Sequence, residues 1–303
     1  MPYNCVVCAK QVPDTKRITG QAMNPDGTVN RANLPAIFNP EDLCALEQAL
    51  AIKDAHGGTV TIVTMGLPAA GEILRQSLYR GADRAILITD RRAAASDTLA
   101  TSYILSCAVK KLAPDIVLCG RQAIDGDTAQ VGPQLAEKLG LPLLTYLEEL
   151  IELGGGRLKA KRSIGAGWEL VSCRLPLLVT VMESAVSTRP PAARRMMKYK
   201  KALSPAEVAK AVDAADPSAT PEAKAADTKK RCDDLKARGL LIDQWNLDDL
   251  GADLTWCGMS GSPTKVHRIQ SVILTGSGYH EVPATDAGCA ELVGQLIDDH
   301  TIG

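Results

Sequence analysis

One stretch of the sequence carries the residue types that hold phosphate groups. Residues 119–133 read Cys-Gly-Arg-Gln-Ala-Ile-Asp-Gly-Asp-Thr-Ala-Gln-Val-Gly-Pro and follow directly on an apolar run. Ligands of open α/β sheets bind at the carboxyl ends of strands, and a helix that starts there points unpaired backbone N–H groups at an anion. Thr128 and Gln130 would add side-chain donors. The stretch indicates one of two things: the phosphate loop of a nucleotide site, or a capped loop that binds nothing.

The helix that follows this loop has two candidate starting points. Asp127 could cap it, and Gln130, three residues later, could then complete a capping box. In the alternative, Gly132 is the cap and Pro133 is the first helical residue. Ahead of both, Asp125-Gly126 is a turn signal in which Gly126 is free to take a positive φ.

Two other predicted strand ends could reach the same ligand. Cys8 and Ala9 end the first strand, and Thr64-Met65-Gly66 leaves a later, β-branched strand. Gly66 would let the backbone approach a ligand closely. In a parallel sheet these strand ends lie on one edge and would converge with the 119–133 loop. Each strand end alone, however, is a common feature of α/β folds and does not indicate a site.

Short apolar runs alternate with helical patterns through residues 1–150. Asn39 is the predicted N-cap of the first helix, with Pro40 in its first turn, and Gly57 and Gly81 end the first two helices. Strands without polar alternation, separated by helices, indicate a doubly wound, mostly parallel α/β sheet covered on both faces. Strands are expected at 5–9, 59–64, 85–89 and 116–119, and helices at about 40–56, 71–80 and 97–112.

In residues 143–183 the alternation of strands and helices gives way to consecutive predicted strands. The runs 147–153 and 157–162 flank Gly154-Gly155-Gly156, which indicates a hairpin. Two more strands are expected at 169–173 and 177–182. We interpret this region as an antiparallel extension of the sheet, so that 1–183 form one nucleotide-binding α/β domain.

The chain beyond this domain divides into three segments. Residues 184–201 hold a run of six Lys and Arg residues without an acidic one, typical of either a solvated face or a partner-docking loop. Residues 202–243 are either an amphipathic helix broken by Pro217 and Pro221 or a partly ordered linker. Residues 244–303 show no apolar period strong enough for a core of their own, and we expect an arm that packs on another chain.

The composition of the 303 residues excludes several classes of protein. A net charge of −1 argues against general nucleic-acid binding and against acidic membranes. No apolar run approaches the roughly 18 residues that a membrane helix needs. Nine singly spaced cysteines, without a secretory signal, favour a reducing cytoplasm.

No metal site is expected. Cys5 and Cys8 lie three positions apart in one predicted strand, which puts their side chains on opposite faces. Core packing is therefore favoured over a metal or redox pair. The four histidines are far apart in the sequence and show no ligand spacing.

Several motifs, in order, resemble the beta subunit of electron-transfer flavoproteins. The similarity runs through about residues 4–183 and returns between 253 and 264. The motifs are Val7-Cys8-Ala9-Lys10-Gln11-Val12-Pro13-Asp14, Asn39-Pro40-Glu41-Asp42, Gly81-Ala82-Asp83-Arg84-Ala85, the loop 120–133, Glu169-x-Val171 followed by Pro176-x-Leu178-Val179-Thr180, then Asp253-Leu254-Thr255 and Gly261-Ser262-Pro263-Thr264. So many ordered motifs make the resemblance specific.

The resemblance implies a fold of the adenine-nucleotide α-hydrolase type and an electron carrier that works as a heterodimer. An alpha subunit would hold the redox FAD, and the arm at 244–303 would pack on that subunit. The pair would take electrons from a dehydrogenase or NADH and pass them to acceptor proteins. The family's nucleotide contacts map onto Cys8, Ala9, Asn39, Val63, Thr64, Met65, Gly66, Gly120, Arg121, Gln122, Ala123, Ile124, Asp125, Gly126, Asp127, Thr128, Ala129, Gln130, Val131 and Gly132.

Within the family, the loop at 126–133 is similar to the electron-bifurcating and nitrogen-fixation-associated branches. The branch that serves fatty-acid oxidation usually carries a carboxylate where Gly126 stands here. Without that charge a pyrophosphate is easier to accommodate. FAD is therefore favoured in this subunit, and the alternative is AMP, with a single FAD in the alpha subunit.

The family's docking loop maps onto residues of the basic run. Ala193 stands where the family usually has a leucine that plugs into the dehydrogenase, which argues against an ordinary acyl-CoA dehydrogenase as partner. The docking residues are Arg189, Ala193, Arg194, Arg195, Met196, Met197 and Lys198. Two rival classes remain: an ATP-using enzyme of similar fold, for which Lys10-Gln11-Val12-Pro13 is the wrong phosphate loop, and a nucleotide sensor, whose late Gly-rich loop is missing.

Overall fold

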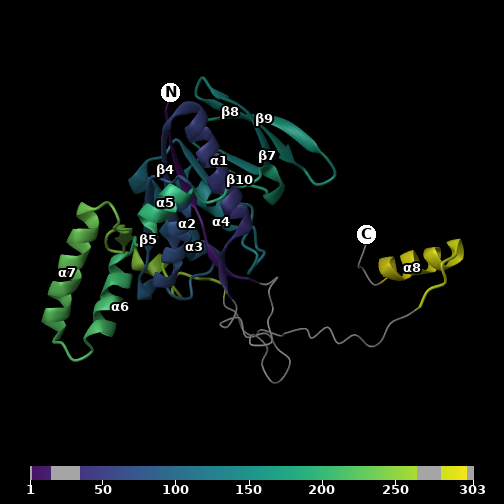
Figure 1. Cartoon of the computed structure of the whole chain (residues 1–303). Helices are drawn as coiled ribbons and strands as arrows, with labels where there is room; N and C mark the ends of the chain where they lie inside the picture. Colours follow the sequence, from purple (N-terminus) through teal and green to yellow (C-terminus); the bar gives the residue numbers. More distant parts are fainter. Residues whose placement is uncertain (1, 15–34, 265–280, 299–303) are drawn as a thin grey trace.

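The body of the molecule is one large sheet with helices on both faces (Figure 1). The computed structural model describes residues 2–14, 35–264 and 281–298. The nine strands follow the order β11-β5-β4-β1-β6-β10-β7-β8-β9, and pairing is parallel from β11 to β7. The strands are β1 (Tyr3–Cys8), β4 (Gly58–Met65), β5 (Arg84–Ile88), β6 (Ile116–Gly120), β7 (Leu143–Gly154), β8 (Arg157–Ser163), β9 (Trp168–Arg174), β10 (Leu177–Val181) and β11 (Asp243–Trp245). A small antiparallel pair, β2 (Gln11–Pro13) with β3 (Ala36–Phe38), follows β1.

Helices cover the sheet in the manner of a doubly wound fold. Those of the domain are α1 (Pro40–His56), α2 (Gly71–Arg80), α3 (Thr98–Leu112) and α4 (Val131–Leu139), followed by α5 (Ala193–Tyr199), α6 (Pro205–Ala215), α7 (Pro221–Ala237) and α8 (Asp286–Asp298). Short 3₁₀ turns are η3 (Pro68–Ala70), η4 (Arg91–Ala93), η5 (Glu183–Ala185) and η6 (Leu254–Trp256).

The two faces of the sheet have separate cores. Cys5 and Val7 point to the face covered by α1 and α2, whereas Val6 and Cys8 point to the face covered by α3 and α4. The predicted α/β class is confirmed, and so is the placement of Cys5 and Cys8 on opposite faces. Both are buried free thiols.

The predicted helix ends agree with the structure in the first half of the chain. Gly57 and Gly81, at φ 75° and 137°, end α1 and α2 in a conformation that favours glycine. The carboxylate of Asp97 caps α3 by accepting the N–H of Ala100 at 3.0 Å. These stops were readable because they depend only on local residue types.

Both predicted starts of α4 were wrong. The helix begins at Val131, with Gln130 as N-cap and no side-chain cap. Asp127 makes no cap because it takes φ 48°, and its carboxylate accepts the amide of Gln122 instead. Gly126 does not take the positive φ that the turn signal suggested; Asp127 and Ala129 do.

The antiparallel extension predicted for 143–183 is confirmed at β7, β8 and β9, but β10 is not part of it. The β7–β8 and β8–β9 pairs are antiparallel, and the hairpin at 154–156 is where it was predicted. β10 instead inserts between β6 and β7 and pairs in parallel with both. All five of its residues are buried, which is the pattern of a central parallel strand.

The C-terminal third is partly built into the domain. Residues 202–243 are helical: α6 and α7 form a hairpin whose connection contains Pro217, and Pro221 starts α7. Residues 244–264 do not form a separate arm, since β11 joins the sheet beside β5 and Cys257 is buried in the core. The rest of the expected arm lies partly outside the described residues, and α8 stands apart from the domain (Figure 1).

None of the helices in the described part of the chain is long and apolar enough to cross a membrane.

The contact of α1 with β6 gives a test of this packing. A Cβ on Gly120 would lie 2.6 Å from Oδ1 of Asp42 and 2.8 Å from its backbone nitrogen. We expect Gly120→Ala to lower the free energy of unfolding by about 1 to 3 kcal/mol, because α1 must shift away from the strand. Urea denaturation of the purified protein measures this. Gly126→Ala is the matched control, since nothing lies within 4 Å of its Cβ position; equal losses in both variants would contradict the packing argument.

Candidate functional site

The order of the strands creates a crevice beside β1. From β1 the chain steps outward through β4 to β5, then returns through α3 to β6 on the other side of β1. Open α/β sheets bind ligands at such a switch point, outside the carboxyl ends of the strands. The predicted contacts at Cys8 and Ala9, at 63–66 and at 120–132 all leave the sheet at this edge, so the structure brings the three groups together.

The start of α1 holds the loop after β6 in place. The side-chain amide of Asn39 donates to the carbonyl of Gln122 at 2.8 Å, and its oxygen accepts the N–H of Ile124 at 3.2 Å. The N–H of Gln122 donates to Oε2 of Glu41 at 2.7 Å. Asn39 therefore precedes α1 as predicted, but its side chain serves the 120–124 loop rather than its own helix.

Asp42 links two strand ends. Its Oδ1 accepts the N–H of Gly120 at 2.8 Å, and its Oδ2 accepts the N–H of Lys10 at 2.9 Å. The side chain is buried, and burial raises its pKa to about 7 in spite of the two backbone donors. Beside it, Glu41 forms an ion pair with Arg121 at 2.9 Å. One carboxylate thus sets the spacing of the loops after β1 and β6.

The loop between β6 and α4 presents unpaired donors. Asp127 and Ala129 have φ of 48° and 52°, and the residue after Ala129 returns to the right-handed helical region. Such alternation turns successive N–H groups toward one point and makes an anion-binding concavity. Within the described residues, the N–H groups of Ala129, Gln130, Val131 and Gly132 donate no hydrogen bond. The last two also begin α4, where the helix dipole favours negative charge.

A second set of contacts closes the same loop over β1. Both carboxylate oxygens of Asp125 accept from Nζ of Lys10 at 2.7 Å. At Gly126 a Cβ would meet nothing within 4 Å, so the loop is open to a ligand there. Thr98, at the start of α3, donates to the Gln130 side chain at 2.9 Å.

The end of β4 supplies a free hydroxyl. Oγ1 of Thr64 is buried and has no hydrogen-bond partner in the part of the chain that the structure describes. A Cβ on Gly66 would meet only the Ala70 methyl, at 3.5 Å, so the backbone can be approached. Burial raises the pKa of the Cys8 thiol to about 12, which rules it out as a nucleophile at neutral pH. An orphaned hydroxyl and a row of unpaired N–H groups fit a phosphate-bearing ligand.

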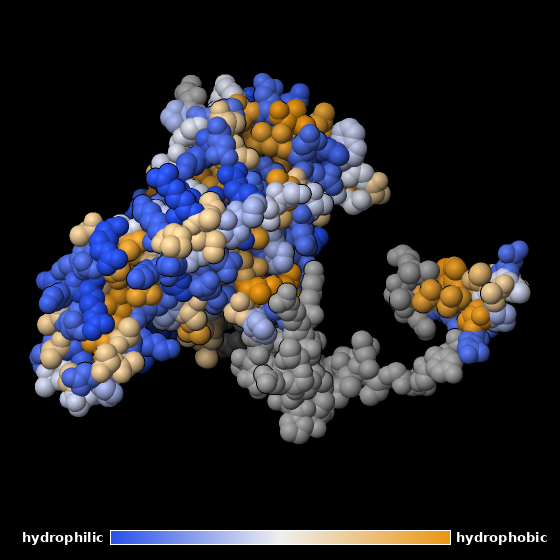
Figure 2. Space-filling model, in the orientation of Figure 1, coloured by the Kyte–Doolittle hydropathy of each residue, from blue (hydrophilic) through white to orange (hydrophobic). Residues whose placement is uncertain are grey.

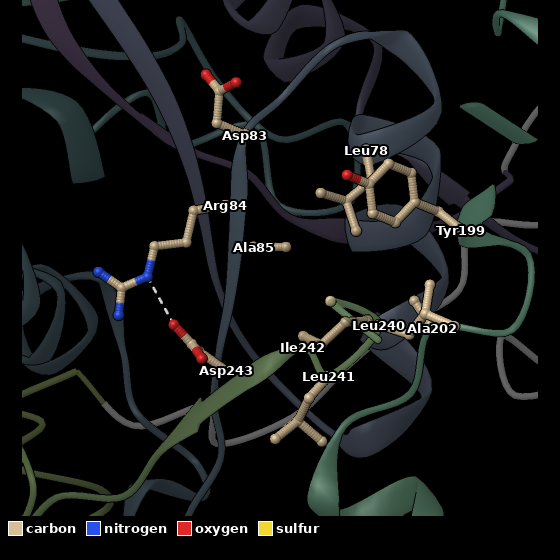
Figure 3. Close-up of a pocket in the computed structure, with 11 residues that line it drawn as sticks. Leu78, Asp83, Arg84, Ala85, Tyr199, Ala202, Leu240, Leu241, Ile242 and Asp243 are labelled. Atoms are coloured by element: carbon tan, nitrogen blue, oxygen red, sulfur yellow. Dashed lines mark hydrogen bonds and ion pairs between the residues drawn. The ribbon is translucent and has the colours of Figure 1, made fainter. Parts of the chain in front are cut away.

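Two partly open pockets lie elsewhere. One of about 210 Å³ sits at the amino ends of β5 and β11, lined by Tyr199, Ile242 and the Arg84–Asp243 ion pair (Figure 3). Another, of about 300 Å³, lies between the second half of α1 and β7. Neither touches the carboxyl edge, where the predicted contacts gather.

The predicted docking residues are divided in role. Arg189 is engaged within the chain, paired with Glu47 and Asp54 at 2.9 Å. Arg195 donates to the carbonyls of Leu78 and Ala82, both at 2.6 Å, and so fastens α5 to α2. The residues of α5 that remain exposed are Ala193, Arg194, Met196, Met197 and Lys198.

Sequence reasoning missed Lys10, Glu41 and Asp42 as parts of the site. The two motifs that contain them were noted for the start of a helix, for the family resemblance and, at Lys10, as the wrong phosphate loop for an ATP-using enzyme. The one available signal was two acidic residues in a first turn, which the helix dipole alone explains. Glu41 and Asp42 have partners about 80 positions away, at the end of β6 and just after it, whereas the side chain of Lys10 pairs with Asp125, 115 positions away.

Comparison with known proteins gives a consistent result. Residues 26–225 match the electron transfer flavoprotein domain. The chain is 36% identical to the electron transfer flavoprotein subunit beta of Clostridium acetobutylicum over 299 residues, covering 99% of this chain and 100% of that protein. It is 40% identical to protein FixA of Azorhizobium caulinodans, over 95% of this chain and 92% of that one. It is 49% identical to the acryloyl-CoA reductase electron transfer subunit gamma of Anaerotignum propionicum, over 60% and 69%.

The raised pKa of Asp42 predicts a pH dependence. The folded chain keeps this proton up to about pH 7, whereas an unfolded aspartate loses it near pH 4. Ionisation therefore lowers the free energy of unfolding between these values, and the cost persists above pH 7. Because Asp42→Asn cannot ionise, we expect its stability relative to the wild type to rise from pH 5 to pH 8. Urea denaturation at each pH measures this, with Asp233→Asn, exposed on α7, as baseline; parallel profiles would refute the assignment.

Proposed function

This chain belongs to the electron transfer flavoprotein family, in the role of its beta subunit, and we propose that it binds an adenine nucleotide at the carboxyl ends of β1, β4 and β6. The observation that carries the proposal is the loop 127–132, where unpaired N–H groups converge at the start of α4. A phosphate would complete them. The orphaned hydroxyl of Thr64 and the open backbone at Gly66 would face the rest of the ligand.

We favour FAD over AMP as the nucleotide of this subunit. Both ligands share the adenosine and one phosphate, so the difference lies in the room beyond that phosphate. Gly126 leaves its Cβ direction empty within 4 Å and brings no charge. A carboxylate there would repel a second phosphate by about 1 to 4 kcal/mol at a separation of ~4 Å. With AMP, the subunit would be a structural partner in a shuttle with a single FAD.

The proposed carrier is a heterodimer with an alpha-type subunit that holds another FAD. In α8, Leu292, Val293 and Ile297 are 41–51% exposed, and Figure 2 shows the helix as a hydrophobic surface away from the domain. Apolar side chains gathered in this way mark a contact with another protein. We propose that α8, rather than the whole of 244–303, forms the arm. Two flavins in one dimer would allow bifurcation, in which an electron pair from NADH or a dehydrogenase is divided between two acceptors.

A nucleotide count tests the identity of the ligand. The purified heterodimer, denatured and analysed by liquid chromatography, should release two FAD and no AMP. Gly126→Asp should then lower the count to one FAD. Because its Cβ position is empty, the variant should share the thermal midpoint of the wild type once both are stripped of nucleotide. One FAD and one AMP in the wild type would refute the FAD assignment. A dimer with no adenine nucleotide in this subunit would refute the site itself.

A charge reversal tests α5 as the docking surface. Arg194 and Lys198 are exposed, so reversing both to Glu should slow electron transfer to an acidic redox partner about tenfold at low salt. Stopped-flow rates over a range of ionic strength measure the effect, which should fade as salt rises. The control reverses Lys229 and Lys230, equally exposed on α7. Arg195 is left intact because it holds α5 on α2. Equal rates in the two variants would remove α5 from the docking surface.

A further inference from the structure

The N-terminus of α6 packs on the first turn of α2. Oε2 of Glu207 lies 2.7 Å from the place that a Cβ on Gly71 would occupy, so the carboxylate fills the space that the glycine leaves. α6 also contacts η3. Since η3 and Gly71 follow directly on Gly66, segment 202–243 touches the continuation of the proposed nucleotide loop.

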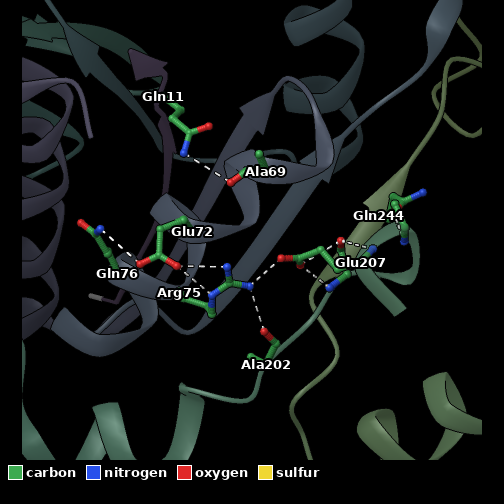
Figure 4. A network of polar contacts seen from close by, with 10 residues as sticks. Gln11, Ala69, Glu72, Arg75, Gln76, Ala202, Glu207 and Gln244 are labelled. Carbon is green, nitrogen blue, oxygen red and sulfur yellow. Dashed lines mark hydrogen bonds and ion pairs between the residues drawn. The ribbon is translucent and has the colours of Figure 1, made fainter. Parts of the chain in front are cut away.

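Arg75, a residue of α2, links α2 to α6. Its Nη1 donates to Oε1 of Glu207 at 2.8 Å and to the carbonyl of Ala202 at 3.1 Å. Its Nη2 pairs with Glu72, one turn earlier in α2, at 3.0 Å. Figure 4 shows the guanidinium between the two carboxylates. The side chains of Arg75 and Glu207 are only 13% and 17% exposed, so water screens this pair less than a surface pair.

Contacts within residues 202–244 also hold Glu207 in place. Its Oε2 accepts the N–H of Ser204 at 2.9 Å in a capping box, and the N–H of Ala206 donates to the side chain of Gln244 at 2.9 Å. Val208 and Val212 are buried in the core on the α1–α2 face. Glu207 therefore cannot follow α2 if the start of that helix moves.

The other side of η3 is held as well. The side-chain amide of Gln11 donates to the carbonyl of Ala69 at 3.3 Å. The turn after Gly66 is thus fixed between β2 on one side and α6 on the other (Figure 4).

We propose that Glu207 and Arg75 are positioning residues, through which segment 202–243 braces the start of α2 and holds Met65 and Gly66 in their nucleotide-binding conformation. The inference rests on the proposed function. Without the brace the loop would sample other conformations, and the apparent affinity would fall with the fraction of chains that remain competent to bind. A loop that is no longer braced also opens more often around bound nucleotide, so part of the loss appears as faster release.

The test measures nucleotide release from the purified heterodimer. The complex is diluted into excess unlabelled competitor, and the bound adenine nucleotide that remains is counted over time. Glu207→Gln should speed release from this subunit about tenfold, equivalent to about 1.4 kcal/mol. The matched control is Asp213→Asn, which breaks the Lys224–Asp213 ion pair of the same hairpin at 3.2 Å without touching α2. It should release at the wild-type rate.

A second variant separates positioning from stability. Gly71→Ala puts a methyl group where the Glu207 carboxylate lies, yet alanine favours the helix. It should release nucleotide faster, whereas its thermal midpoint, measured after the nucleotide has been removed, should stay close to that of the wild type. Wild-type release rates in both Glu207→Gln and Gly71→Ala would overturn the brace while leaving the nucleotide site standing. A wild-type heterodimer without nucleotide in this subunit would overturn both.

Discussion

The buried carboxylate of Asp42 is the contact on which the rest of the site depends. It accepts one N–H from the loop after β1 and one from the end of β6, and so fixes the two sides of the crevice at one spacing. Gly120 must lack a side chain for this approach, and Asn39 and Glu41 extend the same hold to residues 122–124. The start of α1 therefore acts as a template for a loop about 80 residues later. Burying the ionised carboxylate of Asp42 away from water costs free energy, and this cost appears as a raised pKa.

Much of the fold could be predicted because the strands and helices of parallel α/β units have local sequence signals. The stops at Gly57 and Gly81 depend on residue type alone and appear where predicted, and the helix expected at 97–112 is found as α3, with Asp97 as its cap. β10 was misassigned because its partners, β6 and β7, are chosen by pairing across the sheet. β11 was missed for the same reason: three half-buried residues carry little pattern until β5 lies beside them.

The location of the candidate site was predictable from the sequence, but the contacts that hold its loops in place were not. Strand ends at Ala9, Gly66 and Gly120 follow from the parallel sheet, and the structure puts them on one edge. The conformation of 126–130 was not predictable, because the positive φ falls on Asp127 and Ala129 rather than on Gly126, the residue type that adopts it most easily. The partners of Lys10, Asp42 and Glu207 were beyond reach too, since each is a contact between segments far apart in the chain.

The α6–α7 hairpin leaves and rejoins the domain at almost the same point. Leu203 pairs with Leu241 as an isolated parallel bridge, the N–H of Leu203 donates to Leu240 at 3.1 Å, and that of Ile242 returns to Leu203 at 2.9 Å. The residues between Leu203 and Leu241 do not affect the strand order of the sheet. Closing a loop of such length costs only slightly more than closing a short one. The tip of the hairpin, away from Glu207 and from the buried Val208 and Val212, can therefore change in length without altering the sheet.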